Sequence, residues 1–113
     1  MARKLLFVCS RARRRSLTAE RVFSSRPGLS VRSAGTEEAA RVRVTARMLA
    51  WADLVFVMER RHLARLRQRF PAEAGALARD GRIVVLDIPD LHECMAEELV
   101  IELTAAVEPY LDD

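Results

Sequence analysis

A cysteine and an arginine separated by five residues stand near the start of the chain, in the segment LLFVCSRARRRSLTAE at residues 5–20. Cys9 follows an apolar run, and Arg15 and Ser16 stand where a helical pattern begins. A loop of this length between a strand and a helix can surround one tetrahedral oxyanion with backbone N–H groups, and the helix N-terminus adds partial positive charge. Arg15 can donate two parallel hydrogen bonds to such an anion, which lysine cannot reproduce.

The same segment supplies a candidate nucleophile. Positive charge near a thiol favours the thiolate, which is its reactive form, and the Ser16 hydroxyl can donate a hydrogen bond to the sulfur. We therefore interpret Cys9 as a nucleophile that faces a bound phosphoryl group. The rest of the proposed anion-binding loop consists of Ser10, Arg11, Ala12, Arg13 and Arg14. Spacing alone leaves an alternative, in which Cys9 is a small buried side chain at a strand end.

The elements that must position these residues alternate along the chain. Short apolar runs predict strands at residues 4–8, 29–33, 53–59 and 82–86. Helical spacing of apolar residues predicts helices at about residues 17–25, 44–52, 63–70 and 97–111. Pro71 should end the third helix, and the alanine-rich residues 72–81 predict one or two further helical turns.

Strands that are apolar throughout and separated by helices indicate a parallel sheet covered on both faces. We predict a single α/β domain over residues 1–113, a small doubly wound fold with a four-stranded parallel sheet flanked by helices. Ligands bind beyond the carboxyl ends of the strands in such a sheet. Cys9, Glu59 and the DIPD loop at residues 87–90 each follow a predicted strand, so we expect them to share one edge.

Composition narrows the class of partner. The net charge of +3 and pI near 9.5 favour anionic ligands, whereas 5% aromatic residues argue against a base-stacking surface for nucleic acid. We interpret the basic segment ERRHLARLRQRF at residues 59–70, His62 included, as a solvent-exposed helix face. The two histidines and two cysteines lie far apart, and no glycine-rich nucleotide motif occurs, so we expect neither a metal nor a cofactor.

The cellular setting follows from what the chain lacks. No apolar run reaches the length of a membrane span, and the four-residue apolar stretch near the N-terminus is too short for a signal peptide. Cys9 and Cys94 do not make the disulfide framework of a small secreted protein. We therefore expect a cytoplasmic protein that binds neither membranes nor nucleic acid.

Residues 8–20 resemble the active-site segment of the low-molecular-weight protein tyrosine phosphatases, whose pattern is V-C-x-G-N-x-C-R-S-P-x-A-E. Three further segments follow in the family's order: RSAGT at 32–36, WADLVFVME at 51–59 and DIPD at 87–90. The last of these is similar to the family's D-x-P-D-P-Y-G stretch. The resemblance extends from Lys4 to the last helix, with a shortened stretch between Thr36 and Val44. It indicates a compact, divergent branch of that family.

The resemblance implies a role for each matching residue. Cys9 corresponds to the nucleophile that forms a cysteinyl-phosphate, Arg15 to the phosphate-binding arginine, and Ser16 to the serine that stabilises the thiolate. Asp90 corresponds to the acid that protonates the leaving phenol and then activates water, and Ser33 to a serine that supports the loop. The implied activity is hydrolysis of phosphotyrosine in proteins or of small aryl phosphates, with inorganic phosphate or sulfate also binding in the loop.

The departures from the family pattern keep two alternatives open. Arg11 and Ala12 stand at the family's Gly and Asn, and Leu17 and Leu91 stand at two of its prolines. That Asn braces the loop in a left-handed backbone conformation, which alanine adopts at an energetic cost. One alternative is therefore a module that binds phosphate or phosphoproteins with weak turnover. The other is an arsenate reductase in which Cys94 resolves the oxidised intermediate.

Overall fold

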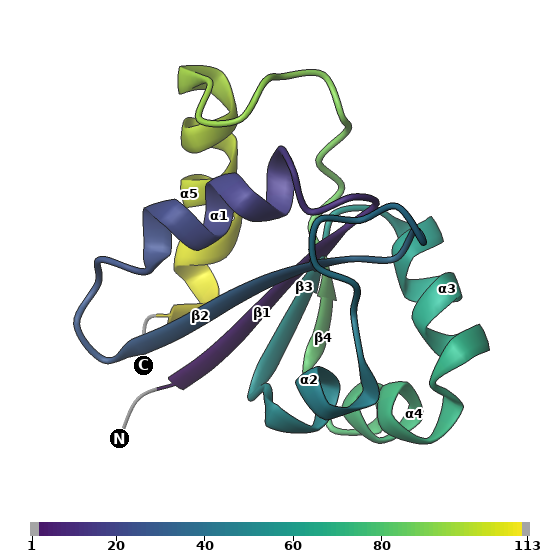
Figure 1. Cartoon of the computed structure of the whole chain (residues 1–113). Helices are drawn as coiled ribbons and strands as arrows, with labels where there is room; N and C mark the ends of the chain where they lie inside the picture. Colours follow the sequence, from purple (N-terminus) through teal and green to yellow (C-terminus); the bar gives the residue numbers. More distant parts are fainter. Residues whose placement is uncertain (1–2, 112–113) are drawn as a thin grey trace.

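The computed structural model describes residues 3–111 and contains a four-stranded, all-parallel sheet with helices on both faces (Figure 1). The strand order is β2-β1-β3-β4, which confirms the predicted α/β fold class. Within the described residues, no helix is long and apolar enough to cross a membrane. The elements in chain order are β1 (Arg3–Cys9), α1 (Arg15–Phe23), β2 (Leu29–Gly35), α2 (Ala46–Trp51), β3 (Leu54–Val57), α3 (Arg60–Arg69), α4 (Pro71–Arg79), β4 (Ile83–Val85) and α5 (Glu97–Leu111).

The central strand β1 has a core on each side, because successive side chains of a strand point to opposite faces. Leu5 and Phe7 pack in the core beneath α1 and α5, where Phe7 stacks on Phe23 with ring centroids 5.7 Å apart. Leu6 and Val8 pack in the second core, beneath α2, α3 and α4. This two-sided burial is the physical reason for the continuous apolar run of β1.

Several boundaries differ from the sequence-based expectation. Helix α3 begins at Arg60 instead of residue 63, and β3 covers only Leu54–Val57 of the predicted 53–59. Helix α1 begins at Arg15, two residues earlier than expected, and β2 extends to Gly35 rather than ending at residue 33. The alanine-rich segment forms a helix of nine residues, α4, which is longer than one or two turns. Pro71 ends α3 as expected but also occupies the first turn of α4, where its missing N–H costs nothing.

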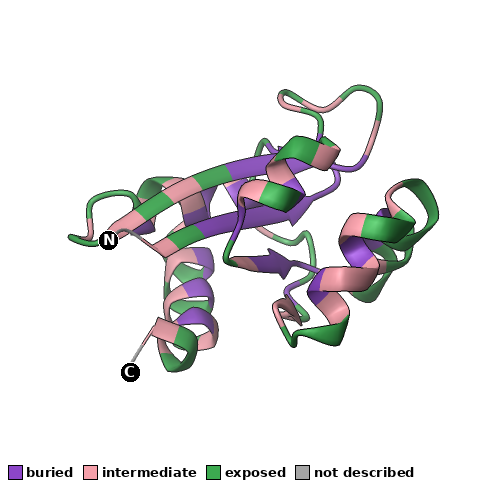
Figure 2. Cartoon of the chain, turned by 90° about the horizontal axis from the view of Figure 1, so that it is seen from below, coloured by how far each residue is buried: buried purple, intermediate pink, exposed green. Residues whose placement is uncertain are grey.

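The carboxyl ends of the strands meet at one edge of the sheet, as expected. Backbone hydrogen bonds join them there: Met58 N–H donates to the Val8 carbonyl at 3.0 Å, and Ile88 N–H donates to the Met58 carbonyl at 2.9 Å. The buried residues of β1 and β2 are concentrated toward this edge (Figure 2). The segments that follow β1, β3 and β4 are therefore anchored side by side.

Candidate active site

The loop between β1 and α1 borders a cavity of about 430 Å³ at this edge of the sheet. Cys9 and Asp90 both line the cavity, although they are far apart in sequence. Its other lining residues are Ser10, Arg11, Arg13, Arg14, Arg15, Glu37 and Arg61. Every residue expected at the site from sequence therefore lines the cavity except Ser16 and Ala12, whose side chains are fully buried.

The Cys9 sulfur lies within reach of two hydrogen-bond donors. Sγ is 3.0 Å from Ser16 Oγ and accepts a hydrogen bond from the backbone N–H of Ala12 at 3.2 Å. Both the Ser16 hydroxyl and the Ala12 N–H can donate hydrogen bonds to a sulfur at this position. Because Cys9 is the last residue of β1 and Ser16 lies in the first turn of α1, the strand-loop-helix geometry itself brings the two side chains together.

Arg15 is 2% exposed, yet it lines the cavity. Its Nη1 donates to Glu59 Oε2 at 2.5 Å and to the Ile88 carbonyl at 2.9 Å. Nε and Nη2 make no hydrogen bond with any described residue, and Nε lies 3.9 Å from Asp90 Oδ1. The guanidinium is therefore fixed on one side and can present two donors to an oxyanion on the other.

Glu59 remains ionised beside this arginine. Hydrogen bonds from Arg61 and from Arg15 lower the pKa of Glu59 to about 2. Its carboxylate also accepts from the backbone N–H of His62, and His62 Nδ1 accepts from the Glu59 N–H at 3.1 Å, so the two residues close a capping box at the start of α3. One carboxylate thus positions Arg15 and caps a helix.

His62 is buried, so its assignment to an exposed basic face was wrong. Since Nδ1 accepts the Glu59 N–H, the neutral ring carries its proton on Nε2, which lies 3.0 Å from Ser10 Oγ. Burial, with repulsion from Arg15, lowers the pKa of His62 to about 4. His62 therefore acts as a neutral donor that holds the first residue of the loop after Cys9.

Arg41 supplies a brace that sequence reasoning missed. Ala12 has φ of +58°, the left-handed conformation expected for this position. Arg41 Nε donates to the Ala12 carbonyl at 2.7 Å, and the Arg41 backbone N–H donates to the Arg11 carbonyl at 2.9 Å. Arg41 Nη2 also donates to Ser33 Oγ at 2.8 Å. Ser33 therefore contacts the loop's brace rather than the loop itself.

Gly35, at the end of β2, lets this brace come close. A Cβ at Gly35 would lie 2.5 Å from the Ser10 carbonyl oxygen and 2.9 Å from the Arg11 carbonyl carbon, both backbone atoms of the loop. It would also lie 2.6 Å from the Cβ of Ala40. Only a residue without a side chain fits between the loop and the segment before Arg41.

The two aspartates of the DIPD loop face different surroundings. Asp90 lines the cavity of Cys9, and its Oδ1 lies 3.8 Å from Arg14 Nη1. Asp87, with φ of +57°, lines a separate hollow together with Glu59 and Pro89. A proton donor for a group bound at Cys9 must share its cavity, which favours Asp90 over Asp87.

Cys94 does not line the cavity of Cys9. Its sulfur is partly buried and accepts from Thr18 Oγ1 at 3.6 Å and from Arg21 Nη1 at 3.7 Å, both on α1. Within residues 3–111, no group of three or more His, Cys, Asp or Glu side chains is arranged to hold a metal ion. The cavity brings the Cys9 thiol and the Asp90 carboxyl group together with arginine side chains.

Comparison with solved structures identifies the fold. The chain is similar to Wzb of Vibrio vulnificus, solved in complex with benzylphosphonate, with a TM-score of 0.74, 22% identity and coverage of 97% of each chain. A low-molecular-weight phosphotyrosine phosphatase of Vibrio cholerae gives 0.71, 20% identity and 97% coverage of each chain. The YwlE arginine phosphatase of Geobacillus stearothermophilus gives 0.69 and 19% identity, with coverage of 96% of this chain and 93% of that one.

These matches show that the chain has the fold of the low-molecular-weight protein tyrosine phosphatases over nearly its whole length, as the sequence segments implied. No family model and no curated protein matches the sequence. The matched structures are named for different substrates, so the shared fold does not by itself define a substrate.

Proposed function

We propose that the protein is a cysteine-dependent phosphatase that hydrolyses phosphotyrosine or other aryl phosphate monoesters through a cysteinyl-phosphate intermediate. The observation that carries the proposal is that Cys9, Arg15 and Asp90 line one cavity, with Arg15 Nε 3.9 Å from Asp90 Oδ1. Nucleophile, oxyanion donor and proton donor are the three groups that this reaction requires.

In the first step the phosphoryl group binds in the loop, with two of its oxygens against Nε and Nη2 of Arg15. The Cys9 thiolate attacks phosphorus, forming the S–P bond as the P–O bond to the phenol breaks. Asp90 donates its proton to the departing oxygen. Charge that develops on the phosphoryl oxygens meets donors that Glu59 has already oriented, so little reorganisation is needed.

In the second step water attacks the phosphorus atom of the cysteinyl-phosphate. The Asp90 carboxylate takes a proton from this water, the S–P bond breaks, and inorganic phosphate and the Cys9 thiolate are released. The Ser16 hydroxyl, 3.0 Å from the sulfur, stabilises the departing thiolate. The cycle ends with the protons on the groups that held them at the start.

Two further observations support this choice. Benzylphosphonate, the ligand in the Wzb complex, is a non-hydrolysable analogue of an aryl-type phosphate ester. Cys94 contacts α1 and does not line the cavity, so it is poorly placed to act as the resolving thiol of an arsenate reductase. We also propose a cytoplasmic location, because a reducing compartment keeps Cys9 a free thiol.

Hydrolysis of p-nitrophenyl phosphate by the purified protein tests the proposal. We expect Cys9→Ser to abolish turnover and Asp90→Ala to reduce kcat by about two to four orders of magnitude, the usual contribution of a general acid. Asp87→Ala is the matched control and should have little effect. Vanadate binding without any turnover of the wild-type protein would instead identify a phosphate-binding module, and a crippling effect of Asp87→Ala alone would refute the assignment of Asp90.

A further inference from the structure

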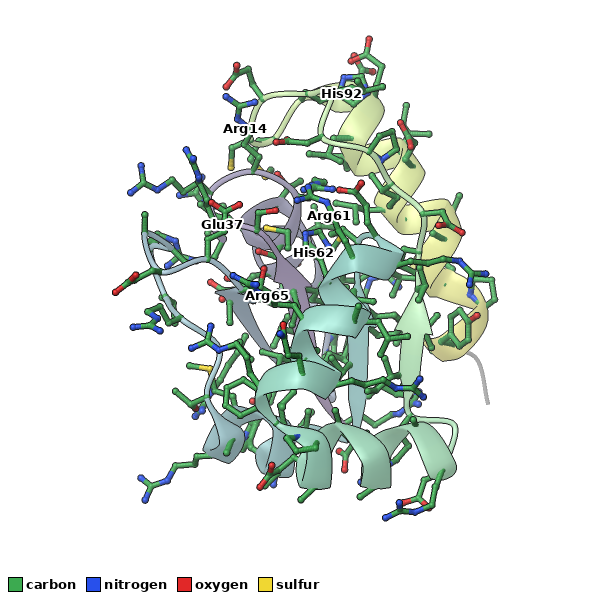
Figure 3. All side chains as sticks on the ribbon, turned by 90° about the vertical axis from the view of Figure 1, so that its right-hand side faces the viewer. Arg14, Glu37, Arg61, His62, Arg65 and His92 are labelled. Carbon is green, nitrogen blue, oxygen red and sulfur yellow. The ribbon has the colours of Figure 1, made fainter. Side chains whose placement is uncertain are left out.

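A second hollow adjoins the cavity of Cys9. It has a volume of about 510 Å³ and is lined by Thr36, Glu37, Arg61, His62 and Arg65. Glu37 and Arg61 line both spaces, so the two hollows are neighbours that share these two side chains. In Figure 3, Arg61, His62 and Arg65 follow one another along α3, and Glu37 lies on the loop after β2. A ligand bound in the first hollow therefore has the second hollow beside it.

The second hollow carries net positive charge. Arg61 and Arg65 stand four residues apart on α3, which places their side chains on one face of the helix. His62 contributes no charge near neutral pH because its pKa is lowered to about 4. Glu37 is the only acidic residue that lines the hollow within the described chain, and its carboxylate already pairs with Arg11 at 3.2 Å.

Arg65 is available to a ligand. It is exposed, and its guanidinium makes no hydrogen bond or ion pair with any described residue. Arg61 is 58% exposed and uses Nε and Nη2 to bind Glu59. The hollow thus offers one unpaired guanidinium and one that is held in place beside the phosphoryl site.

The other face of α3 offers an internal comparison. Arg67 is also exposed, but it lines a separate hollow with Pro71, Gly75 and Arg79, away from Cys9. Arg65 and Arg67 therefore carry the same charge on the same helix but face different surroundings. A ligand effect that depends on Arg65 and not on Arg67 must come from position rather than from total charge.

We propose that the hollow between α3 and residues 36–37 is a subsite for a carboxylate side chain of the substrate, supplied by an acidic residue close to the phosphorylated residue of a protein. The inference rests on the proposed phosphatase function, since it assigns the neighbouring cavity to the phosphoryl group. An extended peptide advances about 3.5 Å per residue, so residues next to the phosphorylated one reach the adjoining hollow. Charge complementarity with Arg65 and Arg61 then selects Asp or Glu there.

Two phosphotyrosine peptides that differ only by Glu→Gln beside the phosphotyrosine test this subsite. We expect the wild-type protein to hydrolyse the Glu peptide with a kcat/KM about two- to fivefold higher, the range for a partly exposed ion pair, and the advantage to shrink in high salt. Arg65→Ala should remove the preference and Arg65→Glu should reverse it. Arg67→Ala is the matched control and should keep it.

Two reference measurements separate this inference from the proposed function. Turnover of p-nitrophenyl phosphate reports the phosphoryl site alone, so its absence in the wild-type protein contradicts the phosphatase and not the subsite. Peptide binding to Cys9→Ala, measured by titration calorimetry, reports the subsite without any chemistry. Equal binding of the two peptides, or equal losses in Arg65→Ala and Arg67→Ala, would overturn the subsite even if hydrolysis is rapid.

Discussion

Replacing Arg41 with alanine tests whether an arginine outside the loop holds the anion-binding conformation. The side chain donates to the Ala12 carbonyl at 2.7 Å and to Ser33 Oγ at 2.8 Å. A hydrogen bond from a charged donor contributes about 1.5–3 kcal/mol, and the exposure of Arg41 favours the lower figure. Since only the bond to Ala12 acts on the loop directly, we expect a loss of about 1.5 kcal/mol, which is about tenfold in oxyanion affinity.

Ala12 makes this brace necessary. Its left-handed backbone, with φ of +58°, costs a non-glycine residue about 1–2 kcal/mol, so an unbraced loop gains free energy by relaxing. Glycine adopts a left-handed backbone without that energetic cost. In an Ala12→Gly background, Arg41→Ala should therefore weaken binding by clearly less than tenfold, and the difference between the two backgrounds measures the coupling between brace and strain.

Competitive inhibition by vanadate and calorimetric titration with phosphate measure the affinity, and the melting temperature shows whether the fold is retained. Arg43→Ala is the control, because the Arg43 side chain makes no hydrogen bond or ion pair within residues 3–111. Equal weakening by Arg41→Ala and Arg43→Ala would reduce the effect to a general loss of positive charge. Unchanged vanadate inhibition in Arg41→Ala would refute the brace.

Three further predictions concern neighbouring residues. Because the pKa of His62 is lowered to about 4 in the folded protein, the unfolded chain binds more protons between about pH 6.5 and 4. The free energy of unfolding should therefore fall by about 2 kcal/mol from pH 7 to pH 5. Urea denaturation of His62→Gln should show a flatter dependence on pH. Gly35→Ala should abolish vanadate binding while circular dichroism stays native-like, because the new methyl group meets loop backbone; normal binding would contradict the contact. Cys94→Ser should leave hydrolysis of p-nitrophenyl phosphate under reducing conditions unchanged, and a large loss would restore the reductase alternative.

The sheet and the cysteine loop could be predicted because their signals are local. A strand buried on both faces needs an apolar run, and Cys9 and Arg15 occur within one strand-loop-helix segment. Helix α4 was predicted too short because Gly75 and the many alanines give a weak apolar period. In the sequence, only Pro71 indicates where α4 begins, and the sequence-based prediction uses Pro71 only as the end of α3.

The contacts of Arg41 and His62 could not be predicted by the same reasoning. Arg41 lies in a loop without periodicity and binds the Ala12 backbone carbonyl, which no residue pattern encodes. The capping box of Glu59 and His62 depends on knowing that α3 begins at residue 60, and its third-position partner is His instead of the usual Glu or Gln. Because the chain contains many arginines, the basic pattern of residues 59–70 predicts an exposed helix face even though one of these residues, His62, is buried.

The parallel order of the strands has a consequence for how the protein folds. Every pairing in this sheet is parallel, so each requires a crossover, and no hairpin can bring two strands together locally. Cys9, Ser33 and Gly35 belong to the β1-α1-β2 unit, whereas Glu59 joins only with β3 and Asp90 only after β4. Closing longer loops costs more entropy, so we expect a refolding chain to build the cysteine loop before its charge partners arrive. During that interval the site still lacks Glu59 and Asp90. A pulse of alkylating reagent should therefore modify the Cys9 thiol far faster than in the native protein.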